Sequence, residues 1–176
     1  MCIRDIRYSC CVAEVLLKIK SDLAVFGKGV ANGMPLAVIT GKRKYMEKFN
    51  DVFYSTTYGG ETLSLAASIA VINEIKRKPV IKHCWNLGSI LNSEFNKLAD
   101  EIGVNIKMEG IPVRSSIICK NSNGKPSLLI KSLFYQEMVK RGILFGPGWV
   151  FLSYSHSMKD IKKTLDASKK LSLIHI

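Results

Sequence analysis

Hydrophobic and polar positions in the first half of the chain predict short strands followed by helices. Asp22–Phe26 and Leu36–Thr40 are apolar stretches of strand length, and a glycine-rich turn separates them. Lys42–Phe49 has the pattern of a short helix. Thr62–Lys78 carries apolar residues on most of its sides at helical spacing, which predicts a buried helix. Pro79 ends that helix, because proline cannot donate the next helical hydrogen bond.

From about Val80 onward the pattern predicts a second lobe in which helices pack against a small sheet. Ser89–Ile102 and Ser127–Arg141 have helical spacing, and Gly103 is placed to end the first of them. A last helix begins at Ser157, with Asp160 as the partner in a capping box. The strands that we expect in this lobe are Val104–Met108, Val113–Lys120, Ile143–Phe145 and Val150–Tyr154.

Composition indicates a soluble globular protein. Of the 176 residues, 47% are hydrophobic and 23% charged, and no apolar run reaches the ~18–20 residues that span a bilayer. The cysteines form no C-x-x-C pair and no metal-ligand spacing, so we expect reduced thiols, a cytoplasmic protein and no bound metal. The five cysteines are Cys2, Cys10, Cys11, Cys84 and Cys119.

The net charge of +12 has two interpretations. It indicates either a surface for nucleic acid or membrane, or lysines that are simply solvated. We favour solvated lysines, because they are spread through the predicted helices and no basic-aromatic binding motif is present. We therefore expect no nucleic-acid and no membrane partner. A basic, non-catalytic nucleic-acid-binding module is the alternative function.

Lys28 is the first residue with the potential for catalysis. It stands between Gly27 and Gly29, directly after the first predicted strand, and small neighbours let a planar ring approach the backbone. A lysine shielded from water can form a Schiff base, which is what pyridoxal phosphate (PLP) requires of its protein. A solvated surface lysine is the alternative, and the local pattern by itself favours that alternative.

The segment Ser55–Glu61 is a candidate anion site. Its hydroxyls and glycines stand before a long predicted helix, whose first N–H groups and dipole attract negative charge. Thr56 and Thr57 add hydroxyl donors for a phosphate. An ordinary helix cap with a glycine turn explains the same residues equally well.

In order and spacing, these motifs resemble class III aminotransferases, in particular glutamate-1-semialdehyde aminomutase-like proteins. The matching segments are "DLAVFGKGVANGMPLAVITGKRKYMEKF", then "YSTTYGGETLSLAA", and finally "RGILFGPGWVFLSYSHSMKDIKKTL". The resemblance spans roughly residues 7–171. It implies an α/β protein of PLP fold type I, with the C-terminal part of the large cofactor-binding domain in residues 1–79 and a small α+β domain in residues 80–176.

The resemblance also implies an activity and a set of site residues. The enzyme would move an amino group between small-molecule donor and acceptor, or within one substrate, as a homodimer. Lys28 would form the Schiff base with PLP and shuttle the substrate proton. Thr57 would bind the phosphate of the cofactor in the neighbouring subunit, assisted by Thr56 and Gly59. Arg114 is a candidate for the substrate carboxylate, with a structural ion pair as the alternative.

At other positions the sequence departs from the family pattern, or matches it without indicating what the residue does. His156 occupies the family's S-x-x-H position, where we favour a histidine held by hydrogen bonds over a catalytic one. Of the family's D-E-x-x-x-G-F-R stretch, whose aspartate pairs with the pyridine nitrogen, only Arg7 is recognisable. Residues 1–6 and about 171–176 resemble translated sequencing adapter. We therefore expect a fragment of the enzyme that is inactive by itself.

Overall fold

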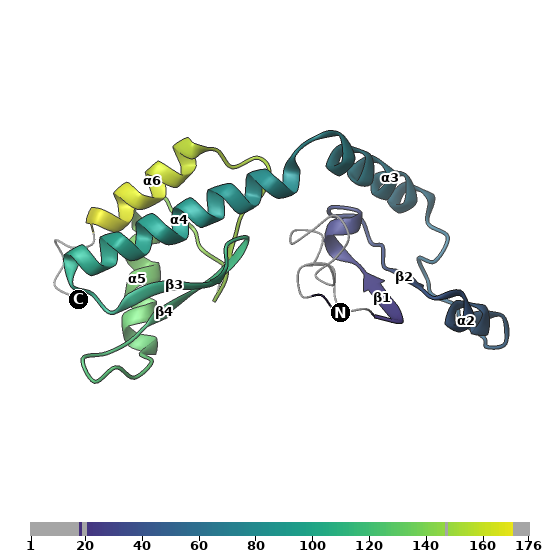
Figure 1. Ribbon diagram of the computed structural model, residues 1–176, viewed down its shortest axis with the longest axis horizontal. Helices are drawn as coiled ribbons and strands as arrows, with labels where there is room; N and C mark the ends of the chain where they lie inside the picture. Colours follow the sequence, from purple (N-terminus) through teal and green to yellow (C-terminus); the bar gives the residue numbers. More distant parts are fainter. Residues whose placement is uncertain (1–17, 19–20, 147, 171–176) are drawn as a thin grey trace. The chain divides into compact units, whose positions relative to one another are not determined.

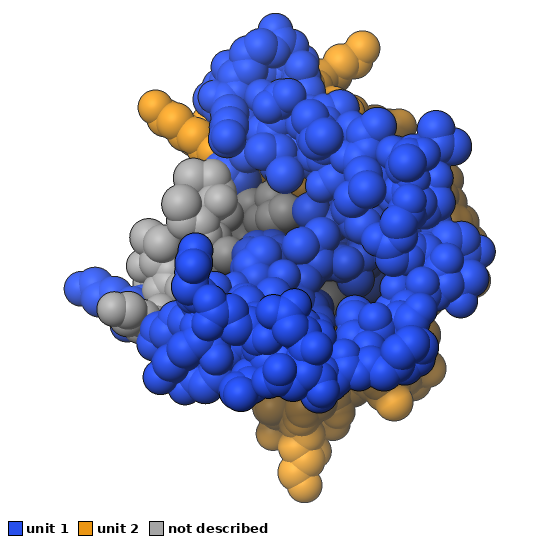
Figure 2. All heavy atoms as spheres, turned by 90° about the vertical axis from the view of Figure 1, so that its right-hand side faces the viewer, with its two compact units in different colours: residues 1–81 blue, residues 82–176 orange. Residues whose placement is uncertain are grey.

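The computed structural model describes residues 18, 21–146 and 148–170 (Figure 1). The chain divides into two compact units, residues 1–81 and residues 82–176, which Figure 2 colours separately. Arg7, Cys2, Cys10 and Cys11 lie outside the described residues, as do both adapter-like ends.

The first unit opens with an antiparallel hairpin. Strand β1 (Leu23–Phe26) pairs with β2 (Val38–Gly41), in a register that sets Leu23 against Gly41 and Phe26 against Val38. The predicted glycine-rich turn between the strands contains a short 3-10 helix, η2 (Lys28–Val30). Three further helices follow along the chain, α2 (Arg43–Met46), η3 (Glu47–Asn50) and α3 (Thr62–Arg77).

Among the described residues of the first unit, a small core forms where the hairpin turn meets α3. Val30 and Ala31 are buried, and Phe26, Met34, Leu36 and Ala67 pack against them. The prediction of a buried α3 was wrong for this chain. The side chains of Leu63 and Ile69 are 67% and 62% exposed, whereas the buried residues of the helix are Ser64 and Ser68. The helical spacing of the apolar residues predicted the helix correctly. Whether those residues are buried depends on another surface that packs against them.

The second unit has helices packed against a small sheet, as predicted, and the sheet has three antiparallel strands among the described residues rather than the four expected. Strands β3 (Ile106–Ile111), β4 (Arg114–Cys119) and β5 (Val150–Phe151) lie in the order β3-β4-β5. The helices are α4 (Val80–Ile102), α5 (Leu128–Lys140) and α6 (Met158–Lys169).

The core of the second unit joins α4 and α5 to the sheet. Phe134 of α5 meets Phe95 of α4 edge to face, with 5.9 Å between the ring centroids. The side-chain amide of Asn96 makes two hydrogen bonds with the backbone of Met108, of 2.7 and 2.9 Å, which tie α4 to β3. The most deeply buried hydrophobic side chains of the described residues are Phe134, Ile117, Met138 and Val113, all in this unit.

Helix α4 begins at Val80, nine residues earlier than we predicted from the spacing. Gly88 lies inside it, and glycine weakens a helix when it is judged from local propensity alone. In the fold this glycine is required, because an added Cβ would lie 2.1 Å from the carbonyl oxygen of Pro112. The residue that interrupts the sequence pattern is therefore the point where the β3–β4 turn approaches the helix.

The structure corrects the strands near the end of the chain. Residues 143–145 form no strand, and β5 is limited to Val150 and Phe151 rather than extending to Tyr154. An isolated bridge between Gly146 and Trp149 closes the intervening turn. Both helix ends predicted here were correct. Gly103 has the positive φ of +77° expected after α4, and Asp160 completes the capping box with Ser157.

In the part of the chain that the structure describes, no helix is long and apolar enough to cross a membrane. The same residues contain no cluster of His, Cys, Asp and Glu suited to a metal ion. Cys84 and Cys119 are buried and reduced, and burial raises the pKa of the Cys119 thiol to about 11.

Candidate active site

Lys28 projects from the first residue of η2, directly after β1. Its side chain is exposed, so the shielding from water that the Schiff-base argument assumed is not provided by the described residues, and it has no hydrogen-bond or ion-pair partner among them. Its carbonyl oxygen accepts the N–H groups of Ala31 (3.3 Å) and Asn32 (3.1 Å), so the turn holds the lysine backbone. Because Val30 and Ala31 are in the core, Lys28 is an accessible amine on an anchored backbone.

The backbone of Lys28 adopts a φ of +43°. This left-handed region costs an L-residue with a Cβ roughly 1–2 kcal/mol. Backbone strain of this kind concentrates at functional sites, where the surrounding structure imposes it. The sequence did not predict a positive φ at Lys28, because Gly27 and Gly29 on either side could adopt the left-handed conformation at a lower cost.

The loop before α3 presents hydroxyls to solvent. Thr56, Thr57 and Gly59 are all exposed. The N–H of Gly59 donates to the carbonyl of Thr56 (3.1 Å), and a Cβ at position 59 would meet the Thr56 hydroxyl at 3.0 Å. Gly59 thus allows the loop to turn tightly over Thr56. Such a loop can place hydroxyl and N–H donors around an anion.

The N-terminus of α3 itself is already occupied. The carboxylate of Glu61 accepts the N–H groups of Leu63 (2.9 Å) and Ser64 (2.6 Å). The Ser64 hydroxyl, together with these N–H groups, lowers the pKa of the Glu61 carboxyl. The expectation that these first N–H groups bind a phosphate is therefore not met in this structure. The ordinary helix cap named as the alternative for Ser55–Glu61 is thus present, with Glu61 as the capping residue although glutamate is not among the preferred ones.

The structure places the predicted cofactor residues in one unit and Arg114 in the other. Thr56 and Gly59 are in contact, as described above. No hydrogen bond joins Lys28 to Thr57 within the described residues.

Arg114 begins β4 and stacks on an aromatic residue that the sequence did not single out. Its guanidinium carbon lies 3.8 Å from the ring centroid of Trp149, a cation–π contact. Arg114 forms no ion pair with any described residue, so the structural ion pair considered above is not found. Its Nε is buried without a hydrogen-bond partner among those residues. The guanidinium is thus held by stacking and keeps donor capacity for a carboxylate.

His156 is held by hydrogen bonds, as we favoured. Its Nδ1 accepts the N–H of Ser153 (3.1 Å), and its carbonyl oxygen lies 2.7 Å from Nε2 of His83. The ring of His83 also contacts Tyr154 edge to face, at 5.0 Å between centroids. These contacts fix the turn between β5 and α6.

Comparison with known families decides what kind of protein this is. Residues 11–148 match the model of the family Aminotransferase class-III, which covers more than half of the chain. The chain belongs to the class III aminotransferase family. The resemblance found in the lysine and threonine motifs is thereby confirmed at the level of the family.

Two curated relatives of this class III chain indicate the range of activities. A 3-aminobutyryl-CoA aminotransferase of Cloacimonas acidaminovorans is 26% identical over 160 residues, covering 90% of this chain and 39% of the relative. A glutamate-1-semialdehyde 2,1-aminomutase of Alkaliphilus oremlandii is 29% identical over 171 residues, covering 88% of this chain and 39% of the relative. The class III chain therefore spans about 39% of the length of these relatives.

A solved structure confirms the predicted fold class. The PLP internal aldimine form of the FumI protein of Sphingopyxis sp. MTA144 superimposes with a TM-score of 0.81 at 22% identity. The match covers 92% of this chain and 38% of the other. The class III chain thus has the fold of part of a PLP fold type I enzyme.

Proposed function

We propose that this class III chain is part of a PLP-dependent enzyme that moves an amino group, with Lys28 as the lysine that holds the cofactor. The observation that carries the proposal is the state of Lys28. Within the matched residues 11–148, it is an exposed amine without a partner among the described residues, on a strained backbone anchored by the core. A merely solvated lysine does not require a positive φ, and that strain favours the catalytic interpretation.

The residues of this chain have distinct tasks in the proposed reaction. When bound, PLP supplies the electron sink that makes the proton on the substrate Cα acidic. The Nζ of Lys28 accepts that proton and later returns it, which is general acid–base catalysis by one amine. Gly27 and Gly29 leave room on both sides of the lysine for a planar ring.

Thr57 serves the phosphate of the cofactor in a neighbouring subunit, with Thr56 and Gly59 shaping the loop. The exposed hydroxyl-bearing loop supports this assignment. Apolar side chains next to it support a homodimer, because Phe53, Tyr58 and Leu63 are 97%, 56% and 67% exposed. Large apolar patches mark surfaces that another polypeptide covers.

Arg114 binds a substrate carboxylate in this proposal. Stacking on Trp149 leaves the guanidinium few alternative orientations, so less entropy is lost when a carboxylate binds. The substrates are small-molecule amino donors and acceptors, or one substrate in an aminomutase. Because the chain spans about 39% of its relatives, the activity belongs to a longer polypeptide, and residues 1–176 by themselves are inactive. The reduced thiols of Cys84 and Cys119 support a cytoplasmic enzyme.

The test uses the longest polypeptide that the gene encodes, incubated with PLP and then reduced with borohydride. Reduction fixes the pyridoxyl group covalently to the lysine that bears it, and mass spectrometry of peptides locates that lysine. We expect the label on Lys28, together with a visible absorbance band before reduction. Lys28→Ala should lose both the label and the band.

Lys44→Ala is the matched control, since Lys44 is an exposed lysine in α2 of the same unit. It should keep the label on Lys28 and the absorbance band. A pyridoxyl group spread over many lysines, or a band that survives in Lys28→Ala, would contradict the proposal.

A further inference from the structure

The second unit contains a basic groove where the end of α5 meets α6. Its volume is about 710 Å³, within the range of small-molecule sites. Five basic side chains and one acid, Asp166, line it. Its four lysines are close in sequence, between residues 159 and 170, and the fold brings Arg141 beside them. The basic residues of the groove are Arg141, Lys159, Lys162, Lys163 and Lys170.

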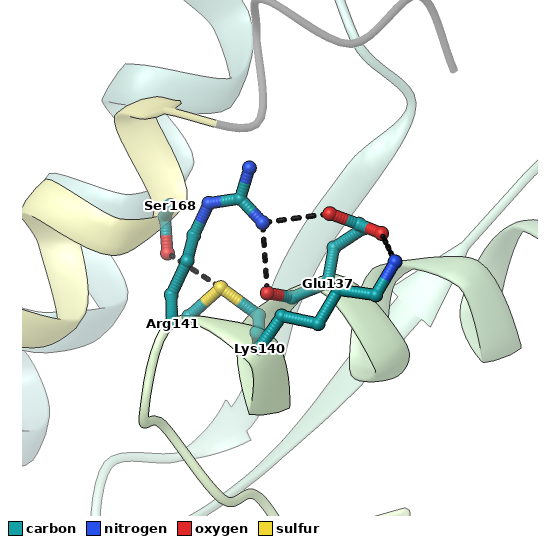
Figure 3. A network of polar contacts seen from close by, with 5 residues as sticks. Glu137, Lys140, Arg141 and Ser168 are labelled. Carbon is teal, nitrogen blue, oxygen red and sulfur yellow. Dashed lines mark hydrogen bonds and ion pairs between the residues drawn. The ribbon is translucent and has the colours of Figure 1, made fainter.

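Arg141 is fixed in place on the α5 side of the groove. Its Nη1 donates to the Glu137 carboxylate (2.7 Å) and to the Glu137 carbonyl (2.9 Å), as Figure 3 shows. The Glu137 side chain is only 10% exposed and also pairs with Lys140 at 2.6 Å. Ser168 of α6 approaches the sulfur of Met138 at 3.8 Å in the same region, so α5 and α6 are packed together beside the arginine (Figure 3).

The lysines of α6 extend the positive charge along the groove. Lys162 and Lys163 follow Lys159 by three and four residues, and the C-cap residue Lys170 follows Lys163 by seven, about two turns, so these side chains lie toward one side of the helix. The Nζ of Lys163 lies 3.7 Å from the position that a Cβ of Gly142 would take, so it reaches the end of α5. Four lysines and an arginine thus line one open groove, and Asp166 is the one acid among its described lining residues.

We propose that this groove binds an oligophosphate anion, a free or ligand-borne chain of two or more phosphates. Glu137 already pairs with Arg141, so Asp166 is the acid left to offset four lysines, and the excess positive charge favours an anion. From Lys159 to Lys170 the helix and its C-cap residue span about 16 Å at 1.5 Å per residue, which suits a short chain of phosphates rather than one monovalent anion. Arg141, with its planar fork already oriented, provides the geometric anchor.

An oligophosphate fits this groove better than a nucleic acid does. Proteins that bind single strands combine cations with aromatic platforms on which bases stack. The groove has none, because its remaining lining residues are Met158 and Ala167. The proposal does not depend on the PLP chemistry proposed above, since none of the cofactor residues lies in this groove.

Titration of the 176-residue chain with inorganic triphosphate by calorimetry tests the proposal. We expect one site, with an affinity that falls by at least about tenfold in the double variant Lys159→Glu/Lys162→Glu. Asp166→Asn should instead bind triphosphate more tightly, by about threefold, because it removes the acid found among the described residues that line the groove. Circular dichroism verifies that each variant is folded.

The double variant Lys82→Glu/Lys125→Glu is the matched control. It makes the same change in net charge at exposed lysines of the same unit, outside the groove. We expect less than about a twofold loss of affinity. An equal loss in both double variants would show general attraction to a basic protein and overturn the proposal. So would an oligothymidylate strand that binds at this groove more tightly than triphosphate.

Discussion

Lys28 combines an accessible amine with a backbone that the local sequence does not prefer. Three described residues other than glycine have positive φ, namely Lys18, Lys28 and Asn32. Asparagine tolerates this conformation because its short polar side chain bonds locally, whereas lysine has no such compensation. If position 28 served only the turn, glycine would satisfy it at a lower cost. The retained lysine therefore favours a chemical role for its side chain.

This reasoning predicts that Lys28→Gly stabilises the chain while abolishing PLP attachment. The free energy gained by relief of the left-handed strain exceeds the cost of the extra conformational entropy that glycine gives the unfolded chain. We expect the free energy of unfolding to rise by about 0.5–1 kcal/mol. Lys28→Ala should give no gain, because alanine keeps a Cβ. Urea unfolding followed by circular dichroism measures both variants.

Asn32→Gly is the control for that measurement. Its φ of +44° is nearly the same, but its strain is smaller because the residue is asparagine. We expect a smaller gain than for Lys28→Gly. Equal stabilities of the glycine and alanine variants at position 28 would show that the strain is absent in solution.

Glu137 makes the stability of the second unit sensitive to acid. Lys140, and then Arg141, hold the pKa of its carboxyl below the ordinary value of 4.5 through hydrogen bonds. Because the pKa is lowered in the folded state, the ionised carboxylate stabilises the fold at pH values above 4.5. This stabilisation is lost as the pH falls through the pKa of the folded state. We expect Glu137→Gln to destabilise the chain at about pH 7 and to differ little from wild type at about pH 3.

Chemical unfolding at the two pH values checks this prediction. Glu109→Gln is the control, because Glu109 is an exposed residue of β3 without an ion pair among the described residues. It should show no comparable difference between the two conditions. A Glu137→Gln variant equally destabilised at both pH values would mean that packing, and not the ionised carboxylate, is what the substitution removes.

At the scale of elements, α3 and α4 show how spacing and packing contribute differently. The spacing identified α3 correctly, but its apolar residues remain exposed because no described element covers them. In α4 the spacing predicted too short a helix, because Gly88 weakened the pattern in its middle. Tertiary packing overrides this propensity, since the glycine lets the backbone at Pro112 approach the helix.

Gly88→Ala is therefore expected to be destabilising, although alanine is the better helix former. The added Cβ would lie 2.1 Å from the Pro112 carbonyl oxygen, so the β3–β4 turn must move. We expect a loss of about 2–3 kcal/mol, as for other overpacked sites. Thermal unfolding of this variant measures the loss.

Ser89→Ala is the neighbouring control in the same helix, at an exposed position. It should change stability by less than about 0.5 kcal/mol. A Gly88→Ala variant as stable as Ser89→Ala would show that the helix and the turn do not approach closely.

At the scale of the molecule, the two units differ in how much core they contain. The hydrophobic residues counted as buried in the first unit are Val30 and Ala31 among its described residues. The second unit buries Phe134, Ile117, Met138 and many others. A unit with few buried apolar side chains gains too little from burial to offset its loss of conformational entropy.

We therefore predict that residues 79–170 fold by themselves, whereas residues 18–78 do not. The first boundary keeps α4 whole, with Pro79 just before it. The longer piece should unfold cooperatively on heating and give a dispersed amide NMR spectrum. The shorter piece should give the narrow amide chemical-shift dispersion of an unfolded chain. A cooperative transition for residues 18–78 alone would contradict the assigned difference between the cores.

The sequence by itself determined features that depend on neighbouring residues. The strands β1 and β2, the stop at Gly103 and the capping box of Ser157 with Asp160 follow from local spacing and local hydrogen bonds. The antiparallel pairing of β1 with β2 was not predicted. The lysine and threonine motifs also identified the family, because motif order is a property of the chain alone. The roles of Lys28, Thr56, Thr57, Gly59 and Arg114 stay predictions.

Only the tertiary structure decided which distant residues meet. It placed Trp149 under Arg114, brought Pro112 against Gly88, and gathered cations from α5 and α6 around one groove. The first two contacts have no sequence signature, because each depends on how elements pack and not on the residues beside it. The four lysines of the groove do follow helical spacing in residues 159–170, and only their meeting with Arg141 depends on packing. Local patterns specify helices, turns and caps. The close approach of separate elements specifies where a glycine is required, which way an arginine is held, and where charges accumulate.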